Sequence, residues 1–281
     1  MLQAGSYHDL KVNRISDHGL YLIDEEDGEE VLLPNRYVSL SDHIGDVKTV
    51  FVYHDSENRL IATTEKPFAV AGEAAFLEVV DKNLHGAFLA WGITAKDLFI
   101  PNSNQNYRLE PGNKYVVFLY RDNVSGRLVA TTRLNTFISN EHITVTPRQE
   151  VEILVAQRVD MGFRVVINHR HWGMIYDNQI FRKVRVGDSM TAYVRRISED
   201  NRIDVSLQQE GFDEVKKSAQ KLLAIIEGAG GMLELNDSSA PELVAQRTQM
   251  SKKVFKRSLG YLLSHSLAVV ENGIIKRPKK R

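Results

Sequence analysis

The sequence predicts a mainly β protein with three small barrels in tandem, followed by a C-terminal domain that combines helices with a β-hairpin. Two observations support this prediction. A strand-rich unit occurs three times, and the spacing of apolar residues changes from two to about 3.6 residues near residue 211. The chain has 281 residues, 43% of them hydrophobic and 26% charged, as in ordinary globular proteins. This length suits several small domains.

The repeat is visible in two near-identical hexapeptides, R-L-I-A-T-T at 59–64 and R-L-V-A-T-T at 127–132, with R-I-D-V-S-L at 202–207 as a third copy. Each copy closes a frame that opens on glycine, and the three frames are G-D-V-K-T-V-F-V-Y (45–53), G-N-K-Y-V-V-F-L-Y (112–120) and G-D-S-M-T-A-Y-V-R (187–195). A second glycine marker precedes each frame, as H-G-L-Y-L (18–22), H-G-A-F-L (85–89) and M-G-F-R-V (161–165).

Each unit contains about five short apolar runs of alternating polarity, separated by Gly, Asn and Asp, which indicates strands at regular spacing. Five strands in roughly 65–75 residues suit a small closed barrel of the OB-fold type. Closure also removes most of the exposed strand edges that small β units otherwise present. We therefore expect barrels at residues 1–66, 67–146 and 147–210.

Residues 211–281 show the signals of a different domain. A first helix is predicted because apolar residues follow helical spacing at Val215, Ala219, Leu222, Leu223 and Ile226. The glycines of G-A-G-G (228–231) are expected to end it. M-L-E-L (232–235) predicts a short strand. Ser239 and Glu242 have capping-box spacing around Pro241, which predicts a second helix to about residue 248.

Two further signals complete this domain. Ser251 is expected to cap a third helix over 252–264, and Asn-Gly within 267–276 predicts a hairpin. Helix, strand, helix, helix and hairpin follow one another in the order of a winged helix. The fold class is therefore three tandem OB-fold barrels followed by an α/β winged-helix domain with a basic tail.

The repeat motifs resemble the S1-type RNA-binding domain, through H-G-A-F-L, the G-D-x-x-x-A-Y-V frame and N-R-I-D-V-S-L. The third unit matches this pattern best, with Tyr176 where that family usually has histidine, whereas the first two units have Pro34 and Pro101 there. Tandem S1-like units followed by a helical domain resemble the conserved virulence factor B family. That resemblance implies a role in regulating gene expression at the level of RNA.

Strand alternation predicts which side chains leave the barrel cores. Val50 and Val52 should face the first core, with Phe51 and Tyr53 outside it. The equivalent outer pairs are Phe118 with Tyr120, and Tyr193 with Arg195. Outward aromatics in tandem barrels have two uses: they pack against a neighbouring barrel, or they stack on the bases of a single-stranded nucleic acid. The sequence leaves both open for the first two units.

Charge decides which part of the chain should attract a polyanion. Residues 1–66 hold 6 Lys and Arg against 13 Asp and Glu, including D-E-E-D-G-E-E at 24–30, whereas residues 211–281 hold 13 against 7. Phosphate contacts need cations, so RNA binding is expected in residues 147–281 and poor binding in 1–146. The third unit interleaves aromatic with basic side chains, among them Trp172, Arg170, Arg182, Lys183, Arg185 and Arg196. Its predicted RNA contacts are Arg164, His171, Tyr176, Tyr193, Arg195 and Arg202.

In the winged helix, the third helix is the one that enters a groove in helix-turn-helix proteins. Its predicted apolar face consists of Val254, Phe255, Leu259, Leu262 and Leu263. Its predicted RNA contacts are Lys252, Lys253, Lys256 and Arg257, supported by the P-K-K-R end of the chain.

These patterns predict a non-enzymatic, cytoplasmic protein that binds single-stranded RNA with little sequence preference and needs no cofactor or metal. There is no cysteine, no signal peptide at the N-terminus, no apolar run that would span a membrane, and no P-loop or dinucleotide fingerprint. H-R-H (169–171) lacks a third metal ligand nearby. Two alternatives remain: a regulator that binds duplex DNA through the winged helix, and a protein-interaction scaffold, such as a ribosome-associated one.

Overall fold

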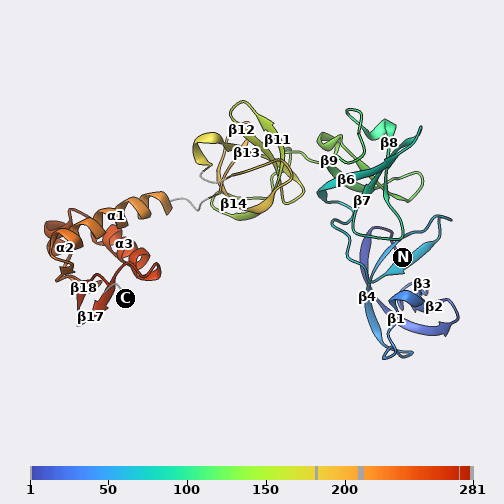
Figure 1. Cartoon of the computed structure of the whole chain (residues 1–281), viewed down its shortest axis with the longest axis horizontal. Coiled ribbons are helices and arrows are strands. Elements are labelled where there is room, and N and C mark those ends of the chain that lie inside the picture. The colour runs from blue at the N-terminus through green and yellow to red at the C-terminus, as the bar shows by residue number, and fades with distance from the viewer. Residues whose placement is uncertain (1, 181–182, 208–211, 272, 279–281) are drawn as a thin grey trace. The chain divides into compact units, whose positions relative to one another are not determined.

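The structure is a computed structural model that describes residues 2–180, 183–207, 212–271 and 273–278. The chain divides into two compact units, Met1–Leu207 and Gln208–Arg281 (Figure 1). The first unit contains the three predicted barrels and the second the winged helix, so the predicted fold class is confirmed. The predicted residues Arg182, Lys279, Lys280 and Arg281 lie outside the described residues.

The first barrel is closed, in the strand order β1-β2-β3-β5-β4. Its strands are β1 Ser6–Ser16, β2 Gly19–Ile23, β3 Glu30–Pro34, β4 Val47–His54 and β5 Leu60–Thr63, with the 3-10 turn η1 Asn35–Tyr37 after β3. Alternate residues fill the interior, and Val50 and Val52 are both fully buried there, as predicted. A parallel pair between Leu32 and Ile61 closes the barrel.

The second barrel forms a five-stranded sheet in the order β10-β9-β6-β7-β8. Its strands are β6 Ala74–Lys82, β7 Gly86–Ala90, β8 Leu98–Pro101, β9 Lys114–Arg121 and β10 Leu128–Thr131, with the 3-10 turns η2 Asn102–Asn104 and η3 Leu134–Thr136. In the described part of the chain, no ladder pair joins β8 to β10, so this barrel is nearly closed rather than closed.

The third barrel is again closed, in the order β11-β12-β13-β15-β14 that the first barrel also has. Its strands are β11 Glu150–Val159, β12 Gly162–Ile167, β13 His171–Tyr176, β14 Ser189–Ile197 and β15 Ile203–Ser206, with the 3-10 turn η4 Asp177–Gln179. Parallel pairs Gly173–Ile203 and Met174–Asp204 close it. A β-bulge between Val194 and Arg196 interrupts the pairing of β14 with β15.

The two glycine markers have a structural reason. Gly19 and Gly162 begin the second strand of their barrels, where a Cβ atom would press against the carbonyl oxygen of Leu33 or Ile175 on the facing strand. Gly45, Gly112 and Gly187 turn the chain into the fourth strand with φ of +98°, +83° and +94°, a conformation that glycine adopts at little cost. The sequence repeat therefore reflects a similar backbone conformation in all three barrels.

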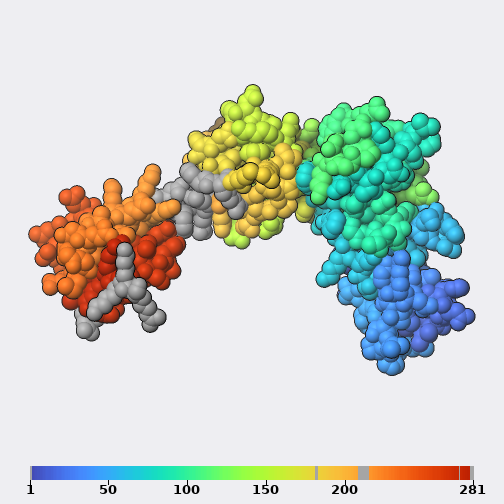
Figure 2. All heavy atoms as spheres, viewed as in Figure 1, coloured from blue at the N-terminus to red at the C-terminus, as the bar shows by residue number. Residues whose placement is uncertain are grey.

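Aromatic side chains join consecutive barrels. Phe51 and Tyr53 on β4 are buried in the same apolar core as Trp91 of the second barrel, with ring centroids 5.6 and 6.3 Å from that indole. Figure 2 shows these two barrels, in blue and teal, in contact. Between the second and third barrels, Phe118 is buried in a core that includes Leu154 and Val166, and the exposed ring of Phe137 stacks on it at 4.7 Å.

The second unit has the predicted winged-helix order: α1 Phe212–Gly228, β16 Met232–Leu233, α2 Pro241–Thr248, α3 Lys252–Ser264, β17 Val269–Glu271 and β18 Ile274–Lys276. Its sheet runs β16-β18-β17, and its core packs Ala219, Leu222 and Ile226 of α1 against Phe255, Leu259 and Leu262 of α3. Contrary to prediction, Val254 and Leu263 are exposed, and the buried face of α3 consists of Phe255, Ser258, Leu259 and Leu262.

The capping prediction holds for one helix and fails for another. Ser251 caps α3 as expected, its side-chain oxygen accepting a hydrogen bond from the backbone N–H of Val254 at 3.3 Å. The N-cap of α2 is Ala240, which has no side-chain cap. Ser239 Oγ instead accepts from the backbone N–H of Asn236 at 2.9 Å, so the predicted capping box does not form.

Candidate nucleic-acid interface

The outward aromatics of the first two barrels are interface residues. Phe51, Tyr53 and Phe118 are buried between barrels, and Tyr120 is half-buried with its ring 4.6 Å from that of Phe137. Burial raises the pKa of the Tyr53 hydroxyl to about 12. Of the two uses left open by the sequence, packing between barrels is the one observed. Phe51 and Phe118 are therefore buried too deeply to stack on a base.

The third barrel instead presents a pocket of about 420 Å³ on the outside of β12, β13 and the β14–β15 turn. Three of the predicted RNA contacts line it: Arg164 from β12, Tyr176 from β13 and Arg202 from the turn before β15. The other lining residues are Asn140, Val159, Met161, Trp172, Gly173, Met174, Asp200, Asn201, Ile203 and Asp204. Residues from four parts of the sequence thus converge on one concave surface.

Arg164 and Trp172 form a stacked pair at this pocket. The guanidinium carbon of Arg164 lies 3.6 Å from the centroid of the Trp172 ring, and its Nη2 donates to Asn135 Oδ1 at 3.1 Å. Desolvation lowers the pKa of Arg164, although an arginine in this setting remains protonated at neutral pH. The buried Nε1–H of Trp172 has no hydrogen-bond partner among the described residues. The pair therefore presents the positioned guanidinium of Arg164 beside the Nε1–H of Trp172, a hydrogen-bond donor without a partner among the described residues.

Tyr176 is oriented by a carboxylate that is itself neutralised. Its hydroxyl donates to Asp204 Oδ1 at 3.3 Å, and Arg196 Nη2 donates to the other oxygen of Asp204 at 3.0 Å. Asp204 is buried, so its charge is paired rather than presented to solvent. At the rim, Arg202 is largely exposed and pairs with Asp200, with 2.6 Å between Nε and Oδ2.

Two more predicted residues lie on β14, away from the pocket lining. Tyr193 is half-buried beside its strand partner Glu150, and a hydrogen bond with that carboxylate raises the pKa of the phenol. Arg195 occupies the bulge position and is exposed, with no ion pair among the described residues. The structure thus gathers Arg164, Tyr176 and Arg202 but does not bring these two β14 residues to them.

His171 is a correction to the predicted interface. It is buried, and both of its ring nitrogens are used inside the protein. Nδ1 lies 2.9 Å from the carbonyl oxygen of Ser139 and must donate to it, so Nε2 accepts from the N–H of Thr144 at 3.2 Å and lies 2.8 Å from its hydroxyl. Through these hydrogen bonds, His171 joins the segment before β11 to β13. Because it is buried and both ring nitrogens are occupied, it cannot contact a ligand.

Asn140 and Met161 line the pocket but were not predicted from the sequence. Asn140 Nδ2 donates to the carbonyl oxygens of Trp172 at 2.9 Å and Asn201 at 2.8 Å, and its Oδ1 accepts from the N–H of Trp172. It therefore fixes two walls of the pocket. No local pattern marks it, because it lies in an irregular connection. Met161 is the exposed first residue of a glycine marker, a turn position that alternation does not assign to either face.

In the winged helix, the predicted cations occupy the first half of α3. Lys253, Lys256 and Arg257 are exposed and Lys252 is half-exposed, with no ion pair to any of the four among the described residues. The capped N-terminus of α3 adds its own positive end to theirs. This is a separate cationic surface, on the helix that corresponds to a recognition helix.

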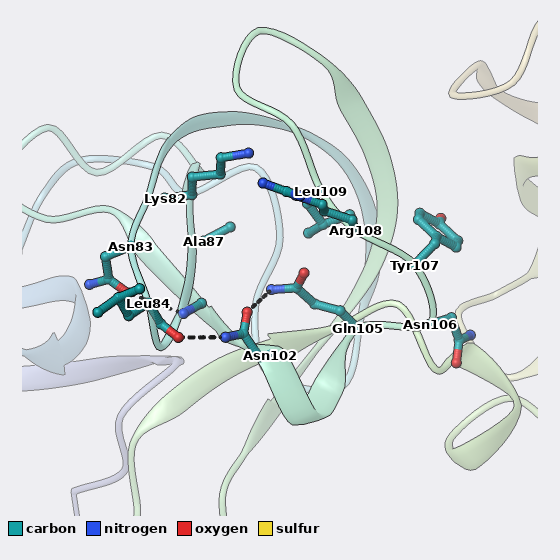
Figure 3. Close-up of a pocket in the computed structure, with 11 residues that line it drawn as sticks. Lys82, Asn83, Leu84, Ala87, Asn102, Gln105, Asn106, Tyr107, Arg108 and Leu109 are labelled. Atoms are coloured by element: carbon teal, nitrogen blue, oxygen red, sulfur yellow. Dashed lines mark hydrogen bonds between the residues drawn. The ribbon is translucent and has the colours of Figure 1, made fainter.

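Another pocket, of about 820 Å³, lies on the second barrel beside the β6–β7 turn and the loop after β8. Figure 3 shows the charged ends of Lys82 and Arg108 close together there; both pair with Glu110. The amides below them hold the loop: Asn102 Nδ2 donates to the Leu84 carbonyl oxygen at 2.7 Å, and Gln105 to that of Ile100 at 3.1 Å. Its polar groups are thus largely satisfied internally.

Other kinds of site leave no trace in the described ranges. No group of three or more His, Asp or Glu side chains there could hold a metal ion. None of the helices described is long and apolar enough to cross a membrane.

Comparison with protein families explains this architecture. An S1 domain model matches residues 4–65 and 71–133, and a CvfB-like winged-helix domain model matches residues 220–276. Homologues named conserved virulence factor B match along almost their full length. The chain belongs to the conserved virulence factor B family.

Relatives of this family member span nearly the whole chain. YitL of Bacillus subtilis (strain 168) is 27% identical over 280 residues, covering 97% of this chain and 93% of the relative. Conserved virulence factor B of Staphylococcus aureus (strain MRSA252) is 21% identical, covering 92% and 89%. A crystal structure of a multidomain protein with nucleic acid binding domains from Streptococcus pneumoniae TIGR4 is similar at 20% identity over 98% of each chain, with a TM-score of 0.42.

The family matches can be compared with the repeat units and the nucleic-acid binding predicted from the sequence. The S1 domain model matches residues within the two units that we expected to be degenerate, and its matched residues do not include the third unit, which we expected to fit the S1 pattern best. The third barrel nevertheless shares the strand order of the first. S1 domains joined to a winged helix fit a nucleic-acid-binding regulator. This virulence factor B family member is therefore expected to contact nucleic acid, and the interface residues above are the candidates for that contact.

Proposed function

We propose that this protein binds single-stranded RNA on the third barrel, with additional phosphate contacts from α3, and acts without catalysis as a cytoplasmic regulator of gene expression. The observation that carries the proposal is the pocket in which Arg164, stacked on Trp172, meets Tyr176 and Arg202. In this pocket, aromatic rings, a desolvated cation and an exposed cation lie together on the outside of the third barrel.

Each lining group suits an unpaired nucleotide. A base can stack on the half-exposed ring of Tyr176 or on the Arg164 guanidinium, which is already held flat by Trp172. Arg202 is free to turn toward a phosphate because its pairing with Asp200 is exposed to solvent and therefore weak. The unpartnered Nε1–H of Trp172 is a donor for an oxygen of the ligand if the side chain shifts slightly.

This arrangement favours single strands and little sequence preference. Bases within a duplex are stacked on each other and cannot lie in the pocket, whereas an unstacked base can. Stacking and phosphate contacts are sequence-tolerant because every base has a π-face and every nucleotide a phosphate. The carboxylate nearest the stacking surface, Asp204, is neutralised by Arg196 and does not repel the strand.

The proposal is tested with the full chain and a charge-matched pair of variants. Arg164→Ala removes the stacked cation, whereas Arg170→Ala removes an exposed cation of the same barrel that does not line the pocket. Fluorescence anisotropy with a labelled single-stranded RNA should show Arg164→Ala weakening binding by about tenfold or more, since one stacked base is worth roughly 1–3 kcal/mol. Equal effects of the two variants on RNA affinity would show that the pocket does not bind the RNA.

Point variants are preferable to dividing the chain between residues 146 and 147. Phe118 and Ile138 on one side of that cut share a core with Leu154 and Val166 on the other, so separated halves would expose apolar surface. Any loss of binding by a fragment would then mix folding with recognition. The expectation that residues 147–281 bind better than 1–146 is therefore best tested by substitutions in each barrel of the intact chain.

Binding of duplex DNA is a second candidate function, favoured by the unpaired cations at the start of α3. Competition between single-stranded RNA and duplex DNA for the full chain distinguishes the two. Preference for the single strand, sensitive to Arg164→Ala, supports the proposed function. Preference for the duplex, sensitive to Lys253→Ala and Lys256→Ala but not to Arg164→Ala, supports the DNA-binding alternative.

A further inference from the structure

A second pocket, of about 340 Å³, opens where the second barrel fails to close. Leu98 and Phe99 of β8 and Leu128 and Val129 of β10 line it, and these are the two strands that no ladder pair joins in the described residues. The end of β4 and the turn after it, in the first barrel, supply the opposite wall through Tyr53, His54 and Ser56. The remaining lining residues are Asn83, His85, Phe88, Trp91, Lys96, Asp97 and Arg127. We call this site the junction pocket.

Arg127 of the junction pocket differs from its two equivalents in the repeat. Arg59 and Arg202 begin the corresponding hexapeptides, and each is ion-paired, Arg59 with Asp55 at 2.8 Å and Arg202 with Asp200 at 2.6 Å. Arg127 is exposed and pairs with no carboxylate among the described residues. Its Nε donates to Asn58 Oδ1 of the first barrel, so Arg127 links the two barrels where it lines the pocket.

Lys96 is the second cation of the junction pocket. Its Nζ donates to the carbonyl oxygens of His54 and Asp55, both at 2.7 Å, and it too has no carboxylate partner among the described residues. Desolvation, and then the charge of Arg127, lower its pKa. Asp97 is exposed and is the sole lining carboxylate. Two cations and one carboxylate leave the pocket with an uncompensated positive charge.

Two phenylalanine rings from β7 and β8 form an aromatic part of the junction pocket lining. The rings of Phe88 on β7 and Phe99 on β8 lie 5.3 Å apart and are both half-buried, on the outer face of the sheet. Nδ1 of His54 is buried and has no hydrogen-bond partner among the described residues. Desolvation, Lys96 and Arg127 all lower the pKa of this imidazole, so it is neutral and able to pair with a polar ligand atom.

We propose that the junction pocket binds one nucleotide, with its base against Phe88 and Phe99 and its phosphate at Arg127 and Lys96. A pocket of 340 Å³ is of the size that small ligands occupy in proteins. The nucleotide is either free in solution or one residue of a polynucleotide, because both present the same base and phosphate. The site is built by two barrels together and does not depend on the interface proposed on the third barrel.

The test uses the intact chain and the repeat as its internal control. Arg127→Ala and Arg59→Ala remove the same repeat position, but only the first lines the junction pocket. In calorimetric titrations, AMP should bind the parent chain more tightly than adenosine or inorganic phosphate alone. Arg127→Ala should weaken AMP binding by about tenfold, the usual cost of a lost charge-assisted hydrogen bond, and Arg59→Ala should leave it unchanged. Thermal melting of both variants checks that they fold.

A single-stranded decanucleotide of RNA distinguishes the two sources. If Arg127→Ala weakens AMP binding, the pocket takes a free nucleotide; if it weakens only the decanucleotide, measured against Arg59→Ala, the pocket takes a nucleotide of a strand. If neither ligand distinguishes the two variants, the proposal is wrong. Arg164→Ala separates this outcome from the proposed function, because it should weaken the decanucleotide and leave AMP binding at the junction pocket intact.

Discussion

Replacing Arg202 by alanine tests the electrostatic part of RNA binding with little disturbance of the fold. The side chain is exposed and its ion pair with Asp200 is solvent-accessible, so the change in the free energy of unfolding should be below about 1 kcal/mol. Removing one phosphate contact from a single-stranded complex should reduce the slope of log K against log salt by about 0.7. Between 50 and 200 mM salt, the affinity ratio of parent to variant should therefore shrink by about 2.5-fold.

The matched control is Arg59→Ala, at the same repeat position in the acidic first barrel, where an arginine that is also largely exposed is paired with Asp55. It should leave the salt slope unchanged. Asp200→Asn should act in the opposite direction, because it releases Arg202 and removes a negative charge from the pocket lining. Anisotropy titrations at four salt concentrations give all three slopes. Indistinguishable slopes for Arg202→Ala and Arg59→Ala would show that Arg202 does not contact a phosphate.

Three further predictions concern stability. Phe51→Ala should lower the free energy of unfolding by about 3–5 kcal/mol in urea titrations, because the ring is fully buried against Trp91; a loss under 1 kcal/mol would show that the barrels are not joined there. Ser251→Ala should cost the winged helix about 1 kcal/mol through loss of the α3 cap, with Ser239→Ala, which caps no helix, costing less; equal losses would contradict the cap assignment. Because the folded-state pKa of Tyr53 is raised to about 12, its neutral form favours folding below pH 10 and this contribution is lost as pH rises through 12. Stability of the parent chain should therefore fall relative to Tyr53→Phe between pH 10 and 12, and parallel curves would refute the assignment.

The architecture was predictable because each strand, turn and helix is marked by residues within its own short stretch of sequence. The marker glycines specify a close strand crossing and a left-handed turn, and both are found three times. The alternation that placed Val50 inside and Phe51 outside the first core was also correct. The neighbour of Phe51 was not predictable, because Trp91 belongs to another barrel and nothing in the strand itself distinguishes a covered outer face from an open one.

The candidate site was predicted in part. Arg164, Tyr176 and Arg202 meet because the strand order of the barrel brings β12, β13 and the β14–β15 turn together. His171 could have been excluded, since alternation from the buried Ile175 also turns residue 171 inward. Asn140 gave no signal, because its role comes from contacts with Trp172 and Asn201, far along the chain.

The most direct test of the account is photochemical cross-linking of the intact protein to a single-stranded RNA that contains 4-thiouridine, with the modified peptides mapped by mass spectrometry. If the third barrel holds the strand, cross-links should form on Trp172 and Tyr176, be lost when unlabelled single-stranded RNA competes, and be retained when duplex DNA competes. Cross-links that spare residues 162–176, or that duplex DNA abolishes, would contradict the claim that the third barrel holds an unpaired RNA strand.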